Sequence, residues 1–338
     1  MPAEQILPGA AGTEGHAKRG GEDAKSDDKS LRGGLLRRLP GGPFPRLREG
    51  ARQVWRAPAK VNLTLHILGR REDGLHDLDS LVAFADCGDL LAFEPGPSLT
   101  LSLDGATAPA AGPAEDNLVI KAARLLQDRV RGLRVGHFHL RKILPVAAGL
   151  GGGSSDAAAA LRALARENGL SLDDPRLGEA ARACGADVLV CLEPRARMMA
   201  GIGDRLGGAP DMPPLPAVLV NPRVAVATPA VFARLGLAKG ERTKAGPAPV
   251  LPEGATLTQI IGTLRLGRND MEAAAIAIAP VVGEALAALE ASGAQLARMS
   301  GSGATCFGLY RDRATSAAAA RALAEKQPGW WIKATALR

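Results

Sequence analysis

Residues 145–161 read Pro-Val-Ala-Ala-Gly-Leu-Gly-Gly-Gly-Ser-Ser-Asp-Ala-Ala-Ala-Ala-Leu. Four of the five residues at 149–153 are glycines, which adopt positive φ readily and let a backbone approach a ligand closely. Ser154, Ser155 and Asp156 suit the start of a helix, where their side chains accept hydrogen bonds from free amides. The first turn of a helix also presents unpaired N–H groups and the positive end of the helix dipole. The stretch therefore predicts a site for an anion, most often a phosphate.

This loop differs from the more familiar phosphate-binding motifs. A P-loop requires a lysine directly after its glycines, but here Ser154 follows them. Ser154 also stands where the dinucleotide fingerprint requires its last glycine or alanine, and the stretch does not fit a nucleophile elbow. On the loop alone, a tight turn followed by a capped helix therefore stays open as a purely structural interpretation.

Composition limits the class of protein. The chain has 338 residues, enough for two domains, and 46% of them are hydrophobic, which is typical of a globular protein with a core. Aromatic residues make up only 3%, which argues against a stacking platform for single-stranded nucleic acid. The net charge of +7 is dispersed along the chain, so it favours an anionic small substrate over nucleic acid.

The cysteines and the apolar segments indicate the cellular compartment in which the protein is expected to work. None of the four cysteines forms a CxxC pair or a zinc pattern, so buried thiols in a reducing compartment are expected. No run of 18 apolar residues and no basic-then-apolar leader pattern is present. We therefore expect a cytoplasmic protein without a membrane partner.

The chain divides into three parts. Residues 1–50 combine Gly, Pro and mixed charges without apolar periodicity, so we expect a disordered N-terminal extension. A proline-rich stretch at 209–216 separates two further halves, which gives expected domains at 51–212 and 213–338. Strands and helices come in blocks without regular alternation, which predicts an α+β fold.

Four elements near the glycine loop can be predicted from pattern. Strict alternation over 60–68 predicts a half-buried strand, and residues 155–168 form the expected helix after the loop. Residues 116–130 read as a helix with Asp116 as its N-cap. The short apolar run 188–192 reads as a strand.

The segment from Pro145 through Ser155 resembles the phosphate-binding motif of the GHMP kinases. Residues 57–63 (Ala-Pro-Ala-Lys-Val-Asn-Leu) and 299–307 (Met-Ser-Gly-Ser-Gly-Ala-Thr-Cys-Phe) resemble the two flanking motifs of that superfamily, in the same order. The resemblance implies a two-domain α+β fold. Its N-terminal, ATP-binding domain would be like ribosomal protein S5 domain 2, its C-terminal domain would be α/β-plait-like, and the active site would lie in the cleft between them.

Three more segments narrow the resemblance. Residues 69–78, 115–118 and 184–188 are similar to those of superfamily members that phosphorylate a cytidine-diphosphate-linked methylerythritol in the non-mevalonate isoprenoid pathway. This implies ATP-dependent phosphorylation of the 2-hydroxyl of that small molecule, with Mg²⁺ as cofactor. It implies no nucleic-acid partner, and monomer and homodimer both stay open.

The resemblance also assigns roles to residues. Asp187, in Gly-Ala-Asp-Val, is the expected general base, and Lys60 is expected to pair with it, orient the acceptor hydroxyl and screen phosphate charge. Ser154 and Ser155 are expected to add hydroxyls to phosphate or Mg²⁺, and no metal ligand is assigned. The implied ATP-binding residues are Pro145, Gly149, Leu150, Gly151, Gly152, Gly153, Ser154, Ser155 and Asn117. The implied substrate-binding residues are Asn62, His76, Thr228 and Phe232.

Two departures from the family pattern and three alternatives remain. Residues 188–191 read Val-Leu-Val-Cys where Val-Pro-Val-Phe is common. Leu75 stands before His76 where a tyrosine is common, so one face of the base site is expected to be aliphatic. The alternatives are a GHMP kinase of the homoserine or mevalonate type, a non-catalytic nucleotide-binding module, and a basic nucleic-acid-binding protein. Lys60 and Asp187 beside an intact loop favour catalysis, and His76 favours a cytidine-linked substrate.

Overall fold

The structure is a computed structural model that describes residues 53–244 and 246–338, and Ala51–Arg338 form one compact unit. The extension expected over residues 1–50 lies outside the described residues. Within the unit, helices and strands are mixed, and every strand pair except β4–β5 is antiparallel. This pairing fits a fold that lacks regular strand–helix alternation.

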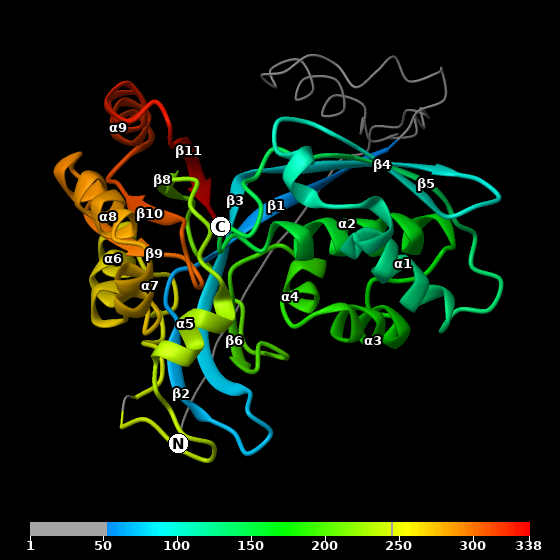
Figure 1. Ribbon diagram of the computed structural model, residues 1–338, viewed down its shortest axis with the longest axis horizontal. Helices are drawn as coiled ribbons and strands as arrows, with labels where there is room; N and C mark the ends of the chain where they lie inside the picture. Colours follow the sequence, from blue (N-terminus) through cyan, green and yellow to red (C-terminus); the bar gives the residue numbers. More distant parts are fainter. Residues whose placement is uncertain (1–52, 245) are drawn as a thin grey trace, which may run out of the picture. The chain divides into compact units, whose positions relative to one another are not determined.

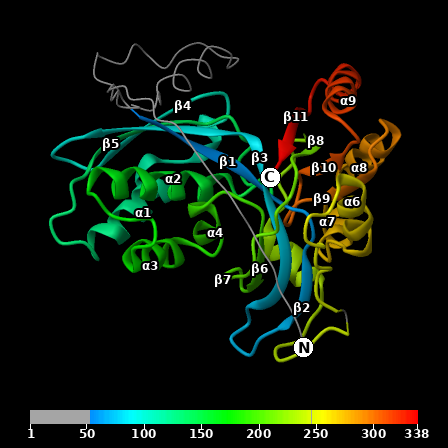
Figure 2. The same ribbon diagram turned by 180° about the vertical axis from the view of Figure 1, so that it is seen from behind.

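The first part of the unit contains the glycine loop and a sheet built around one long strand, β3 (Figure 1). Helices α1 to α4 lie together on one face of this sheet, which both views show (Figure 2). The strands are β1 (Val54–Asn62), β2 (His66–Arg70), β3 (His76–Pro95), β4 (Thr100–Asp104), β5 (Gly136–Arg141), β6 (Arg197–Gly201) and β7 (Arg205–Leu206). The helices are α1 (Leu118–Gln127), α2 (Gly152–Glu167), α3 (Pro175–Cys184) and α4 (Val188–Leu192), with short 3₁₀ turns at Ala108–Ala111 and Ala114–Asp116.

The second part has its own antiparallel strands and five helices among its described residues. Its strands are β8 (Leu215–Asn221), β9 (Leu296–Met299), β10 (Cys306–Leu309) and β11 (Trp331–Leu337), and β8 lies between β10 and β11. Its helices are α5 (Thr228–Arg234), α6 (Leu257–Leu266), α7 (Glu272–Ile278), α8 (Val281–Ala291) and α9 (Arg313–Lys326).

Strand β3 joins the two sheets. It pairs with β1 within residues 82–92, and Ala85 also pairs with Leu337 of β11. Phe84 and Arg338 exchange backbone hydrogen bonds of 2.7 and 2.9 Å. The strands of both parts therefore form one continuous hydrogen-bonded network around the middle of β3.

The alanine-rich composition of α2 explains its place in the core. Residues 155–165 of this helix are all buried, on every side of the helix. It packs against β1, β3, α1 and α4, and small side chains allow the backbones of these neighbours to approach closely. The helix that starts at the glycine loop is therefore held rigidly from all sides.

The single half-buried strand predicted at 60–68 differs from the structure in two ways. The chain leaves the strand after Asn62 and resumes as β2 at His66, so one strand was predicted where there are two. Val61 and Leu63 belong to the same apolar cluster as Leu219 and Phe307 of the second part, so both faces of this region are covered and it is not half-buried.

Three smaller corrections concern helices. Residues 188–192 form helix α4, so the predicted strand is wrong; a short apolar run does not by itself distinguish a buried strand from a buried helix. Helix α1 is capped by Asn117, whose side chain accepts from Val119 N, and not by Asp116. Helix α2 begins at Gly152, three residues before the predicted start.

Among the described residues, no single helix is long and apolar enough to cross a membrane. Helices α7 and α8 reach that length and composition only as a pair, and they are bent by 120° with respect to each other.

Candidate active site

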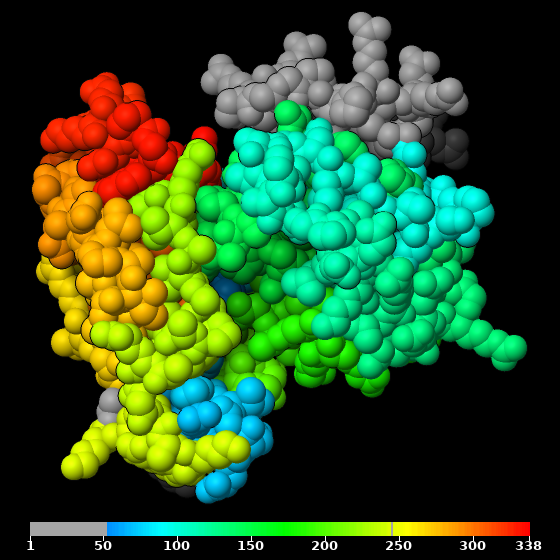
Figure 3. Space-filling view, viewed as in Figure 1, coloured from blue at the N-terminus to red at the C-terminus, as the bar shows by residue number. Residues whose placement is uncertain are grey.

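The glycine loop borders a cavity of about 540 Å³. In Figure 3 the surface is hollowed between the yellow-green segment that includes α5 and the green part that includes the loop, with blue atoms at the bottom. Residues from both parts of the unit line it, including Lys60, Gly151, Asp187, Thr228 and Ser302.

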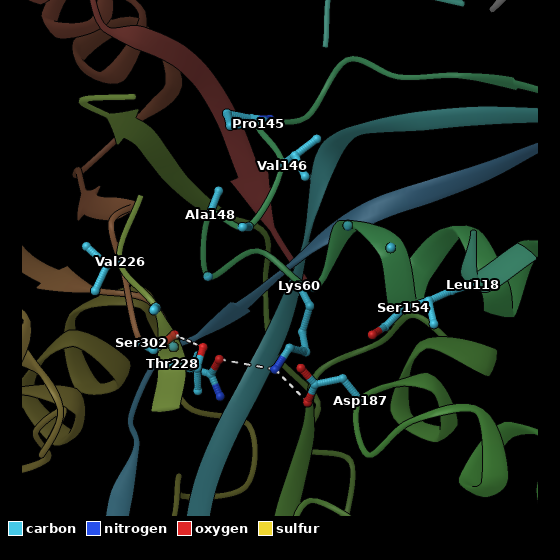
Figure 4. Close-up of a pocket in the computed structure, with 18 of the residues that line it drawn as sticks. Lys60, Leu118, Pro145, Val146, Ala148, Ser154, Asp187, Val226, Thr228 and Ser302 are labelled. Carbon is cyan, nitrogen blue, oxygen red and sulfur yellow. Dashed lines mark hydrogen bonds and ion pairs between the residues drawn. The ribbon is translucent and has the colours of Figure 1, made fainter. Parts of the chain in front are cut away.

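Lys60 and Asp187, the predicted catalytic residues, meet in this cavity (Figure 4). Lys60 Nζ lies 3.0 Å from Asp187 Oδ1 and 3.2 Å from Asn62 Oδ1. The lysine side chain is only 4% exposed, whereas the aspartate is 36% exposed and reaches solvent. Asp187 directly precedes α4 and Lys60 lies near the end of β1, so the pair links residues 127 positions apart in the chain.

The glycine loop needs its glycines at particular places. Gly149 has a φ of +75°, and a Cβ there would lie 2.4 Å from the carbonyl oxygen of Ser300. Gly151 has a φ of +59°, and a Cβ there would meet the side chain of Lys60 at 3.2 Å. Both positions combine a left-handed backbone with close contact, which only glycine tolerates without strain.

The loop is tied directly to the strand that carries Lys60. The backbone N–H of Lys60 donates to Leu150 O at 2.8 Å. Ser300 Oγ accepts from Asn62 N at 3.1 Å and donates to Gly149 O at 2.9 Å, so one hydroxyl joins three segments. The three motifs that identified the superfamily therefore touch one another around the cavity.

Most of the predicted phosphate-binding residues line the cavity, but two do not. Pro145, Gly149, Ser154 and the glycines from 151 to 153 line it, and α2 begins there with first-turn N–H groups that have no partner within the helix. Leu150 is 1% exposed and points into the core, so it contributes its backbone.

Ser155 is the second exception. It is 1% exposed, and its hydroxyl donates to Pro58 O at 2.7 Å and lies 3.4 Å from Cys191 Sγ. Seven residues further along α2, Arg162 donates to Arg56 O and to Cys191 O. Ser155 thus holds α2 against β1 and α4, and its hydroxyl is not presented to the cavity.

Two of the predicted substrate-binding residues line the other side of the cavity, whereas Asn62 lies beside Lys60 and His76 is not among the lining residues. Phe232 and Thr228 of α5 line it, and Thr228 Oγ1 is 2.7 Å from Ser302 Oγ. The ring of His76 stacks on Phe232 with centroids 4.3 Å apart and an angle of 19° between the planes. Leu75 beside it is 49% exposed.

Burial lowers the pKa of His76 below its usual value, and the positive charge of Arg70 lowers it further. The imidazole is therefore neutral near pH 7 and can both donate and accept hydrogen bonds. Asn117 lines the cavity as well, although its side chain also caps α1.

A buried cluster under the loop was not predicted. Lys142 Nζ lies 2.5 Å from Asp89 Oδ2 and 2.6 Å from Asp156 Oδ2. Burial and repulsion from Asp89 raise the pKa of Asp156 to about 8 despite the attraction of Lys142. Burial alone would lower the pKa of Lys142, but the two carboxylates raise it. The alternation of β5 could have indicated that Lys142 is buried. Side chains of a strand alternate between its two faces, and Lys142 falls on the same inward face as Phe138 and Leu140.

Among the described residues, a magnesium ion would find few protein ligands at this cavity. Within 53–244 and 246–338, no three His, Cys, Asp or Glu residues come together as a metal cluster. Mg²⁺ that arrives on a nucleotide keeps several waters and needs only one or two protein oxygens beside the phosphates. The Ser154 hydroxyl, which Figure 4 shows pointing toward the space beside Lys60 and Asp187, would be one such oxygen. The residues therefore fit a metal ion carried by its nucleotide.

Comparison with known proteins agrees with this geometry. Residues 117–193 match the GHMP kinases N terminal domain, and residues 259–329 match the GHMP kinases C terminal domain. A 4-diphosphocytidyl-2-C-methyl-D-erythritol kinase from Methylobacterium radiotolerans is 57% identical over 284 residues, which cover 84% of this chain and 98% of the relative.

Solved structures give the same result. The crystal structure of a 4-(cytidine 5'-diphospho)-2C-methyl-D-erythritol kinase superposes with a TM-score of 0.67 at 33% identity, covering 84% of this chain and 99% of that one. A homoserine kinase from Cytophaga hutchinsonii, at 17% identity with a TM-score of 0.58 over 87% and 97% of the two chains, shares the fold alone. The chain therefore belongs to the GHMP kinases and, within them, to the 4-diphosphocytidyl-2-C-methyl-D-erythritol kinase family.

Proposed function

We propose that this protein transfers the γ-phosphoryl group of ATP to the 2-hydroxyl of 4-diphosphocytidyl-2-C-methyl-D-erythritol, a step of the non-mevalonate isoprenoid pathway. The observation that carries the proposal is the Lys60–Asp187 pair, 3.0 Å apart, beside a glycine loop that opens a helix. Phosphoryl transfer depends mostly on positioning and on neutralising charge, and this arrangement supplies both.

The mechanism follows from the two residues. Asp187 accepts the proton of the acceptor hydroxyl as its oxygen bonds to the γ-phosphorus. The bond from that phosphorus to the bridging oxygen breaks, and ADP leaves with the electron pair. Lys60, held by Asn62 as well as Asp187, orients the acceptor oxygen and screens the charge on the transferred group.

The rest of the cavity has matching roles. Backbone N–H groups of the loop and of the first turn of α2 bind the triphosphate, and Asn117 lies toward the nucleoside. Ser154 would hold Mg²⁺, which when bound neutralises the phosphate oxygens. His76, Phe232 and Thr228 receive the cytidine end of the acceptor, with Asn62 near the alcohol.

The contact between His76 and Phe232 sets a condition on substrate binding. A base stacked between two rings needs them about 7 Å apart, twice the usual stacking distance, but here the centroids are 4.3 Å apart. The base must therefore separate the two rings or stack on one of them from outside.

The proposal also includes a two-domain organisation and a cellular compartment. The boundary falls at residues 212 and 213, between an S5-domain-2-like half and an α/β-plait-like half, and the cavity is the cleft between them. The enzyme works in the cytoplasm, where ATP is supplied; its four cysteines, all of them unpaired thiols, fit a reducing compartment.

A coupled assay of ADP release tests the function. Purified protein is given ATP, Mg²⁺ and one acceptor at a time: the cytidine-diphosphate-linked methylerythritol, methylerythritol phosphate without the cytidine, homoserine, or mevalonate. We expect turnover with the first acceptor, confirmed by a new phosphomonoester signal in ³¹P NMR. Equal or faster turnover with homoserine or mevalonate would refute the assignment.

A further inference from the structure

The buried cluster of Asp89, Lys142 and Asp156 has no assigned part in the transfer described above, although Lys142 and Asp156 border the same cavity. Side-chain exposure is 0% for Asp89, 5% for Lys142 and 1% for Asp156. Buried charges are costly unless they are paired in good geometry, so each of the three strongly restricts where the others can lie.

The cluster connects the two ends of the glycine loop. Lys142 follows β5 directly and precedes the loop, whereas Asp156 lies in α2, just after the loop. Asp89 lies within β3 and also holds the two residues just before the loop. Its Oδ1 accepts from Ile143 N at 2.5 Å and from Leu144 N at 2.8 Å. Lys142 Nζ then bridges from Asp89 to Asp156 at the far end of the loop.

This connection matters because the loop is rich in glycine. A glycine-rich segment loses more conformational freedom on ordering than any other, so a ligand that must order it binds less tightly. If both ends are already held against one strand, the loop needs little further ordering when the triphosphate arrives.

We propose that Asp89, Lys142 and Asp156 form a loop clamp, and that Asp156 and Lys142 are positioning residues for ATP. The clamp holds residues 145–151 at the spacing that binds the triphosphate. This inference rests on the proposed binding of ATP by the loop. It concerns nucleotide affinity and leaves the transfer step to Lys60 and Asp187.

The composition of the clamp indicates which residue to change. It contains two carboxyl groups and one ammonium, and the raised pKa of Asp156 favours the neutral form of that carboxyl. Removing Asp156 therefore leaves the one-to-one pair of Lys142 with Asp89. Removing Lys142 would instead leave two buried carboxylates without a cation. Asp156→Ala is therefore the variant expected to fold, and Asp156→Asn is the conservative variant, because its amide oxygen can still accept from Lys142.

The test compares these two variants with wild type and with Asp174→Ala. Asp174 caps α3 by accepting from Arg176 N at 3.0 Å, so its loss lowers stability away from the cavity. For each protein we would measure the Kd for ADP by calorimetry without acceptor, the KM for ATP, the KM for acceptor, kcat and the melting temperature.

The clamp predicts a specific pattern. Asp156→Ala raises the Kd for ADP and the KM for ATP by about tenfold or more, while kcat and the acceptor KM stay within about threefold. Asp156→Asn restores nucleotide affinity to within about threefold of wild type, and Asp174→Ala lowers the melting temperature without changing any KM. If Asp156→Ala does not fold, Asp156→Ser, which is too short to reach Lys142, takes its place under the same criteria.

Two results would overturn the inference. One is an unchanged Kd for ADP in the alanine or serine variant. The other is a loss spread evenly over both substrates and kcat, which would indicate a general defect of the fold. Failure of wild type itself to bind ADP would instead contradict the proposed function, so the two failures are distinguishable.

Discussion

Replacing Asp187 with asparagine tests the centre of the proposed mechanism. The side chains have nearly the same shape, and the amide oxygen can still accept from Lys60 at the 3.0 Å position of Oδ1. The variant therefore removes the base while keeping the geometry. We expect kcat to fall by about 10²- to 10⁴-fold, the usual range for loss of a general base, which is about 3–5 kcal/mol in activation free energy.

Stability and binding should change much less. Asp187 is 36% exposed and Lys60 keeps its contact with Asn62, so losing the charge of one partner should cost at most about 1 kcal/mol of unfolding free energy. The loop that binds the triphosphate is untouched, so the Kd for ATP should stay within about twofold to threefold of wild type.

The assay is the steady-state rate of ADP release at saturating acceptor, with calorimetry for ATP binding. Asp116→Asn is the matched control, because Asp116 lines the same cavity and loses the same charge but does not contact Lys60. We expect the control to retain kcat within about threefold. A similar kcat in wild type and Asp187→Asn would refute the assigned role, and equal losses in both variants would indicate a general effect of charge.

Three further predictions use other parts of the chain. Gly149→Ala should weaken ADP binding by about tenfold or more in calorimetry, because its φ of +75° and the contact of 2.4 Å with Ser300 O require the loop to move; unchanged binding would contradict the close packing. The KM for acceptor should rise as the pH falls below the ordinary histidine value of about 6.5 and on through the lowered pKa of His76, where the imidazole takes up a proton, and His76→Gln should flatten that profile. The unfolded chain binds this proton more readily than the folded protein, so acidification below about 6.5 also reduces stability, which thermal melts at several pH values would reveal. Deletion of residues 1–50 should leave kcat/KM and the melting temperature nearly unchanged, and a large loss of either would show that the extension contributes to the fold.

The sequence predicted the local part of the site well. The glycine run and the small residues after it determine both the loop and α2, because glycine conformations and alanine packing are local properties. The start of α2 was missed by three residues since Gly152 and Gly153, poor helix formers, continue the helix where tertiary packing compensates.

Contacts between distant segments could not be derived from pattern. Nothing in the alternation of β1 indicates that Lys60 meets Asp187, and only the resemblance to a family suggested that pair. The cover over β1 from the second part of the unit was missed for the same reason, since Val61 shares an apolar cluster with Phe307, 246 positions away in the sequence. Ser155 was assigned to phosphate by analogy, but its neighbours Pro58 and Cys191 are visible only in three dimensions.

Strand β3 restricts how ligands reach the cavity. Two domains joined by a flexible linker can separate as rigid bodies to admit a substrate, but here a 20-residue strand contributes hydrogen bonds to the sheets of both parts. Wide opening would require breaking the paired backbone at Phe84 and Arg338. Entry and release therefore depend on lining segments outside the sheets, such as α5, whose displacement would open the cavity without breaking the paired strands.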